Sequence, residues 1–171
     1  ASQDVAGSGE TPSGDGDGEP ATAVSLPAPV GNYTPSPELA GLARLDPDDP
    51  TALGPVDAPV TMVIWSDYMC PYCARFSLET LPELEKYAEE GILRVEWRDF
   101  AVYGQDAVNA AIGAQAAGKQ GKFWEMHDWI FENQQPQGSG NVTEEFLAAG
   151  AEEVGVDVEQ WTADFADPNE E

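Results

Sequence analysis

Basic residues are scarce in this chain of 171 residues. Seven lysines and arginines stand against 32 aspartates and glutamates, and the formal net charge is −25. A polyanion of this size repels phosphate backbones and anionic lipid headgroups. The composition therefore excludes nucleic acid as a partner and direct binding of the acidic domain to a lipid surface. The acidity itself is expected to serve solubility, with a high-salt habitat or a basic partner as alternatives.

Long apolar runs are also missing. No stretch of about 20 apolar residues is present, as a membrane-spanning helix would require. The chain starts at Ala1, with neither a methionine nor an apolar leader in front. We therefore expect a processed or trimmed chain, compatible with an exported protein that was separated from a signal peptide or a membrane anchor.

Cysteine is rare, since Cys70 and Cys73 are the only two. A bridge between them closes too short a loop to restrict the unfolded chain, and two cysteines are too few for a disulfide-stapled scaffold. Zinc takes four ligands, and the sole histidine, His127, lies far along the chain, so a metal site would need a dimer. We expect no metal and no cofactor other than the redox-active disulfide itself.

Residues 1–36 consist almost entirely of Gly, Ser, Pro, Ala, Thr and acidic residues. This composition predicts a disordered, charge-extended linker. On an exported protein such a linker would tether the domain to a membrane anchor. A tail without function is the alternative.

A strand, a helix and a second strand follow one another after the linker. Val60–Trp65 is a continuous apolar run, which is typical of a strand buried on both faces. Residues 74–90 have helical periodicity, with a kink expected at Pro82 and an end at Gly91. Residues 92–100 alternate between apolar and charged side chains. This order predicts a right-handed βαβ unit with a parallel strand pair.

The cysteines stand between the first strand and the helix. A thiol at a helix start lies near free N–H groups and the positive end of the helix dipole, which favour the thiolate of Cys70. Cys73 lies one turn later, close enough to form a disulfide. Asp67 is expected to cap the helix. Glu96 and Asp99 are candidates for a buried acid that transfers protons, with solvent-facing positions as the alternative.

The second half of the chain has helical patterns. They cover residues 107–117 and 121–133, a helix capped by Thr143, and a short last helix from residue 156. The aromatic residues around His127 are expected to form a core, and His127 to be a half-buried residue with a hydrogen bond.

Three stretches carry a resemblance to a known family: residues 57–76 around Cys70-Pro71-Tyr72-Cys73, residues 93–100 and residues 116–127. Together they resemble the DsbA-like thiol:disulfide oxidoreductases over roughly residues 51–167, and the leader is similar in style to exported or membrane-tethered actinobacterial members. The resemblance implies an α/β thioredoxin-like fold with an inserted helical domain. Residues 37–103 would be the N-terminal part of the thioredoxin-like domain, and residues 104–171 the helical insertion.

The same resemblance implies roles and a function. Cys70 takes the place of the exposed nucleophile, Cys73 that of the buried resolving cysteine, and Pro71 and Tyr72 tune the stability of the thiolate. It implies an extracytoplasmic dithiol oxidase that forms disulfides in unfolded or reduced exported proteins and is recycled by a membrane redox partner. A disulfide reductase or isomerase and a non-catalytic scaffold module are the alternatives.

One departure from the family pattern concerns the substrate-binding proline. Family members continue into a β-hairpin led by a cis-proline loop and then a last helix. After Cys73 this chain has only Pro82, Pro136 and Pro168, none of which is followed by strand sequence. We therefore expect the C-terminal hairpin and the last helix to be lacking. A fragment, an incomplete sequence and strands supplied by a partner are the three explanations.

Overall fold

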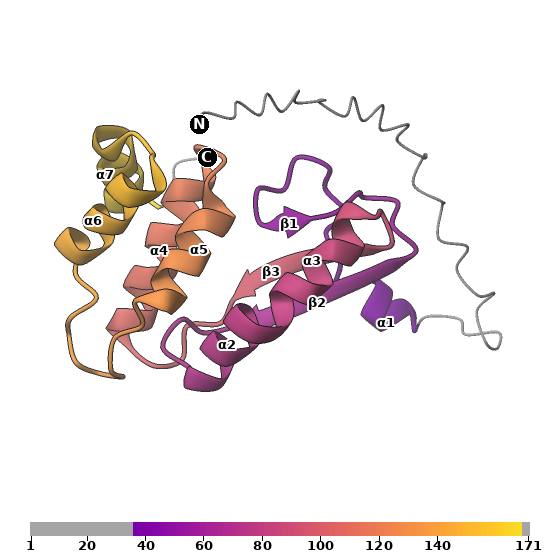
Figure 1. Cartoon of the computed structure of the whole chain (residues 1–171), viewed down its shortest axis with the longest axis horizontal. Helices are drawn as coiled ribbons and strands as arrows, with labels where there is room; N and C mark the ends of the chain where they lie inside the picture. Colours follow the sequence, from indigo (N-terminus) through magenta and orange to yellow (C-terminus); the bar gives the residue numbers. More distant parts are fainter. Residues whose placement is uncertain (1–35, 169–171) are drawn as a thin grey trace, which may run out of the picture. The chain divides into compact units, whose positions relative to one another are not determined.

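The computed structural model describes residues 36–168, so the predicted linker lies outside the described residues except for Ser36. Within this part a three-stranded sheet has the order β1-β3-β2. Its strands are β1 (Ala52–Leu53), β2 (Val60–Ser66) and β3 (Leu93–Asp99), with β2 parallel and β1 antiparallel to β3. The predicted parallel βαβ unit is confirmed (Figure 1).

The connection from β2 to β3 is a helix in three parts. It consists of α2 (Pro71–Arg75), a π-helical turn η1 (Phe76–Thr80) and α3 (Leu81–Glu89). Pro82 lies in the first turn of α3, where its missing N–H costs no hydrogen bond. The kink expected at Pro82 stays a prediction, and the π turn ends at Thr80, two residues before the proline. Gly91, with φ of 74°, follows the helix end as predicted.

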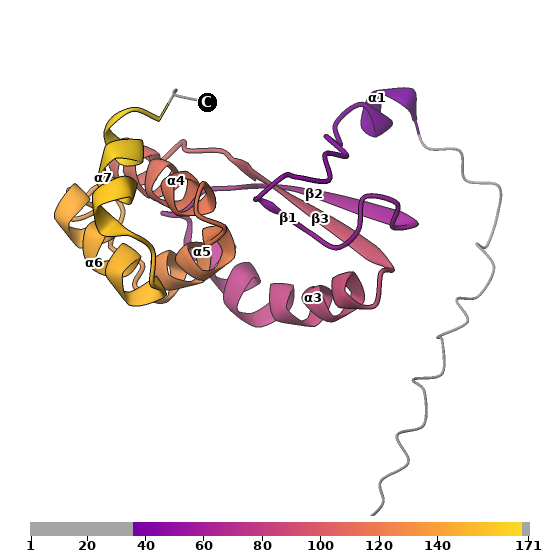
Figure 2. The same ribbon diagram turned by 90° about the horizontal axis from the view of Figure 1, so that it is seen from above.

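The helices after β3 gather into one group, which consists of α4 (Gln105–Gly118), α5 (Phe123–Glu132), α6 (Glu144–Val154) and α7 (Val158–Ala166). Contacts join α4 and α5, α5 and α6, and α6 and α7, and α3 packs against β3. Figure 1 and Figure 2 show α3 along one face of the sheet and the helical group beyond the end of β3. None of the helices within residues 36–168 is long and apolar enough to cross a bilayer. The short helix α1 (Pro37–Ala40) stands apart from this group (Figure 1).

Aromatic side chains join the sheet to the helical group. The Trp97 ring of β3 lies 4.5 Å from the His127 ring and 5.6 Å from the Tyr68 ring, measured between centroids. His127 is fully buried, so its expected half-buried position is wrong. Phe123 and Phe131 of α5 are also buried against this cluster. The predicted aromatic core is confirmed. His127 is buried among these rings, so we assign it a structural role.

The expectation that β2 is buried on both faces is wrong in the described part of the chain. Val60 and Trp65 expose 53% and 49% of their surface, because β2 lies at an edge of the three-stranded sheet. The fully enclosed strand is β3, in which residues 93–97 are all buried. An apolar run therefore predicted the strand correctly but not its place in the sheet.

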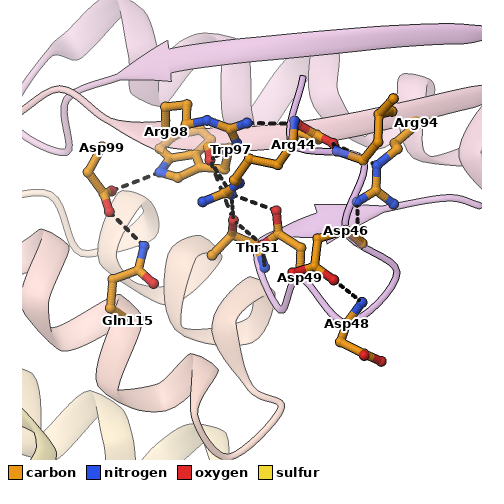
Figure 3. Close-up of polar contacts among 12 residues, drawn as sticks. Arg44, Asp46, Asp48, Asp49, Thr51, Arg94, Trp97, Arg98, Asp99 and Gln115 are labelled. Carbon is orange, nitrogen blue, oxygen red and sulfur yellow. Dashed lines mark hydrogen bonds and ion pairs between the residues drawn. The ribbon is translucent and has the colours of Figure 1, made fainter. Parts of the chain in front are cut away.

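The charged face of β3 is buried as well. Glu96 accepts hydrogen bonds from the side chains of Arg94 and Arg98, and from the backbone N–H groups of Arg44 and Leu45. Figure 3 shows the three arginines beside β3. The segment after α1 covers this face, so the solvent-facing alternative for Glu96 is wrong. The four donors surround the carboxylate and hold it in its charged form.

Candidate active site

The dithiol lies at the junction of β2 and the helix. Cys70 is the N-cap residue of α2, with φ of −83° and ψ of 118°. Its Sγ accepts a hydrogen bond from the backbone N–H of Cys73 at 3.4 Å. Both cysteines are free, and each residue is partly exposed. The arrangement places both cysteines at a helix start, and Cys73 is more exposed than the buried resolving cysteine that the resemblance implied.

Opposing effects act on the Cys70 thiol. Burial, followed by a hydrogen bond with the Cys73 thiol, raises its pKa, whereas the backbone N–H groups of Cys73 and Tyr72 lower it. The raising effects are larger, so the pKa of Cys70 lies above its ordinary value in this reduced dithiol. The N–H groups act as the sequence predicted, but they do not decide the direction.

The two residues between the cysteines are at the surface. Pro71 occupies the first turn of α2, where its fixed φ suits the helix and its missing N–H is not needed. Tyr72 exposes 81% of its surface. A molecule that approached the dithiol would meet both side chains.

Asp67 does not cap the helix, because Cys70 occupies that position. Its Oδ1 accepts the N–H of Met69 at 2.7 Å. Its Oδ2 accepts the N–H groups of Val102 and Tyr103 at 2.6 and 3.0 Å. The buried carboxylate therefore ties the segment before Cys70 to the segment after β3, and the predicted cap is wrong.

Asp99, the second candidate for a proton-transferring acid, is partly buried at the end of β3. Its carboxylate accepts hydrogen bonds from Trp97 Nε1 at 2.9 Å and Gln115 Nε2 at 2.7 Å (Figure 3). Burial raises the pKa of Asp99 despite these donors. By contrast, although burial acts to raise the pKa of Glu96, hydrogen bonds from Arg94, Arg44, Arg98 and Leu45 lower it to about 2. The hydrogen bonds of both carboxylates go to groups other than the thiols.

Two glutamines beside the dithiol have no role in the sequence-based prediction. Gln134 donates to the backbone carbonyls of Tyr68 and Cys70, and Gln137 donates to that of Met69. Both lie in the polar loop after α5, whose composition indicates only a loop. The sole signal in the sequence is the density of glutamine there, which carries no information on what the side chains contact.

An open groove of about 380 Å³ lies beside the dithiol. It runs along β2 and the start of the helix, and most of its lining is apolar. Its walls are Met62, Val63, Ile64, Trp65, Ser66, Tyr72, Cys73 and Phe76. Among residues 36–168 no group of three or more His, Cys, Asp or Glu side chains is placed to hold a metal ion.

Comparisons with known proteins agree with this geometry. The family described as Thioredoxin matches residues 47–168. The probable disulfide bond formation protein D of Bacillus cereus is 35% identical over 119 residues, which are 67% of this chain and 55% of that protein. A Na⁺/H⁺ antiporter of Salinispora arenicola is 34% identical over 131 residues, which are 74% of this chain and 18% of the antiporter. The chain thus spans only about half of one relative and a fifth of the other.

A solved structure gives the same result for the fold. BdbD from Bacillus subtilis, in its oxidised form, superposes with a TM-score of 0.63 at 26% sequence identity. The superposition covers 69% of this chain and 66% of that one. The predicted α/β thioredoxin-like fold is therefore confirmed. Since the family match also spans most of the chain, this protein belongs to the thioredoxin family, as a DsbA-like member.

Proposed function

We propose that this protein performs thiol–disulfide exchange through Cys70 and Cys73, as a dithiol oxidase that forms disulfides in reduced exported proteins. One observation carries the proposal. Both cysteines are free, partly exposed residues at the start of a helix, and the Cys70 Sγ accepts the Cys73 N–H. A thiol in that position can leave and attack as the thiolate, which is the reactive species in exchange.

The reaction begins with the Cys70–Cys73 disulfide. A substrate thiolate attacks the Cys70 Sγ, the bond between the two cysteines breaks, and Cys73 leaves as a thiolate that takes up a proton. A second substrate thiolate then attacks the substrate sulfur in this mixed disulfide and releases the Cys70 thiolate. Two electrons pass from the substrate dithiol to the protein, and the substrate gains a disulfide.

The surface beside the dithiol supports an unfolded polypeptide as the substrate. Phe100 donates its N–H to Ser66 O, and Val102 and Tyr103 donate theirs to Asp67, so the exposed side chains of this segment lie next to the active site. Exposed apolar clusters of this kind mark binding surfaces. The exposed members are Trp65, Tyr72, Phe100, Val102 and Tyr103.

The location and the recycling partner belong to the same proposal. Protein disulfides persist outside the cytoplasm, where an oxidase would find reduced exported chains. The reduced dithiol must pass two electrons to an acceptor, for which we propose a membrane redox partner. Residues 1–36 would then serve as the tether. No further cofactor enters the reaction, because the disulfide itself accepts the electrons.

Oxidation of reduced, unfolded ribonuclease tests the proposal. The oxidised protein is expected to restore ribonuclease activity, and Cys70→Ser is expected to abolish this. Cys73→Ser is expected to abolish it as well, because neither variant can form the disulfide that accepts the two electrons of the substrate dithiol. Failure of the intact disulfide to oxidise ribonuclease would support the scaffold alternative. Reduction of insulin disulfides or repair of scrambled ribonuclease, without net oxidation, would identify a reductase or an isomerase.

A further inference from the structure

The backbone in front of Cys70 is held by side chains from a distant loop. The Nε2 of Gln134 donates to the carbonyl oxygen of Tyr68 at 2.7 Å and to that of Cys70 at 3.1 Å. The Nε2 of Gln137 donates to the carbonyl oxygen of Met69 at 2.8 Å. Two amides therefore hold three consecutive carbonyls, from positions 64 to 68 residues later in the chain.

This segment is held from its other side by Asp67. The Asp67 carboxylate joins the N–H of Met69 to the segment at Val102, and the Cys70 N–H donates to the carbonyl of Asp67. These bonds restrain the backbone that leads from Asp67 to Cys70. The Cys70 carbonyl accepts the Ala74 N–H within the dithiol helix, and among residues 36–168 the Gln134 amide is its one donor from outside that helix.

The Cys70 carbonyl matters for the thiol because both belong to one residue. The ψ angle of Cys70, 118°, sets the direction of its carbonyl and the position of Sγ relative to the Cys73 N–H. A donor on that carbonyl holds this angle. It also offsets the negative end of the peptide dipole beside a sulfur that must carry negative charge.

We propose that Gln134 is a positioning residue for exchange at Cys70, with Gln137 as a second support. Its side-chain amide holds the Cys70 peptide so that Sγ stays on the helix N–H group in the thiolate form. The inference deepens the proposed function and rests on it. It assigns to the loop after α5 a part in setting how strongly the disulfide oxidises.

The proposal has a definite sign. Without the amide donor, the thiolate of Cys70 is less stabilised, so its titration midpoint moves to higher pH. At a pH above that midpoint, where Cys70 is the thiolate, the reduced protein is then less favoured relative to the disulfide, and the protein becomes a weaker oxidant. The expected change is about three- to tenfold in the equilibrium constant with glutathione, the factor that one neutral hydrogen bond contributes.

The test compares Gln134→Met with Gln135→Met. Methionine keeps the length of the side chain and removes the amide. Gln135 is the matched control, because its Nε2 donates to Asn133 O within the same loop and to no residue of the dithiol segment. Thiolate absorbance near about 240 nm is followed against pH in the reduced proteins, and the disulfide is equilibrated with glutathione. Gln134→Met should shift both readouts, and Gln135→Met neither.

The outcomes separate this proposal from the proposed function. If wild type exchanges with glutathione and Gln134→Met matches Gln135→Met in both readouts, Gln134 is not a positioning residue. If wild type fails to exchange, the proposed function is wrong, and an unchanged pH midpoint in Gln134→Met still overturns the positioning role. Should Gln134→Met fail to fold by circular dichroism, Gln137→Met is measured. A smaller upward shift of the midpoint supports the proposal, and no shift overturns it.

Discussion

Arg94 Nε and Glu96 Oε1, on alternate residues of β3, form an ion pair of 2.8 Å in which the side chains expose 3% and 0% of their surface. Arg98 Nη2 forms a second pair with Glu96 at 2.7 Å. Burying a carboxylate with two cationic partners carries a desolvation penalty. Removing the carboxylate and leaving the buried cations unpaired destabilises the folded state more. The stability of the sheet therefore depends on Glu96.

Glu96→Gln is expected to destabilise the fold by about 3–5 kcal/mol, because it leaves the buried Arg94 and the partly buried Arg98 without their counter-ion. Urea unfolding, followed by tryptophan fluorescence, measures the free energy of unfolding. Glu83→Gln is the matched control, since Glu83 pairs with Lys86 where both side chains are more than half exposed. Its cost should stay below about 1 kcal/mol. Equal costs for the two variants would contradict the buried network.

The same carboxylate predicts a loss of stability in acid. The folded pKa of Glu96 is about 2, against an ordinary value of 4.5, so the unfolded chain binds its proton first. The contribution of Glu96 to stability is then complete above pH 4.5 and falls as the pH drops from 4.5 to about 2. Urea unfolding at a series of pH values should show a smaller acid loss in Glu96→Gln than in wild type. Parallel curves for the two proteins would count against this assignment.

Asp67→Ala should destabilise the protein by at least about 2 kcal/mol, since three backbone N–H groups lose their acceptor. Amide hydrogen exchange should become faster at Met69, Val102 and Tyr103. Asp157→Ala serves as the control, because Asp157 accepts one N–H at the exposed start of α7 and should cost about 1 kcal/mol. Unchanged exchange at the three amides would show that Asp67 does not hold the segment.

Gly150→Ala is expected to disturb the contact between α5 and α6. A Cβ at Gly150 would lie 2.5 Å from Cε3 of the Trp129 indole, which is buried and cannot move without repacking. Overpacking of this kind costs about 1–3 kcal/mol. Ala149→Ser, at an exposed position of the same helix, should change stability by less than about 0.5 kcal/mol. Urea unfolding of both variants is the measurement, and a neutral Gly150→Ala would contradict this packing.

Local patterns in the chain were enough to predict several features of the fold. The strand before Cys70, the parallel unit that contains it, the helix end at Gly91 and the helical second half all follow from periodicity and turn chemistry within short windows. The position of the dithiol at a helix start follows from the same windows. These features depend on interactions between residues a few positions apart.

Features that depend on distant neighbours were missed or wrong. The apolar run of β2 does not show that this strand lies at a sheet edge, and the alternating pattern of β3 does not show that Glu96 is buried. Both depend on segments from other parts of the chain. Aspartate is a common residue type at helix N-caps, but the partners of Asp67, Val102 and Tyr103, lie 35 and 36 residues away. Gln134 reaches Cys70 across 64 residues.

The sequence by itself determined the chemistry of this protein: two cysteines, two residues between them, after a strand and before a helix. The tertiary structure alone decided which groups surround them. The position of Cys70 in the sequence, after a strand pattern and before a helix pattern, places its thiol at a helix start. The N–H donors to the Cys70 thiol are local, but the amide that holds its carbonyl comes from a loop that meets it only when the sheet and the helical group pack together.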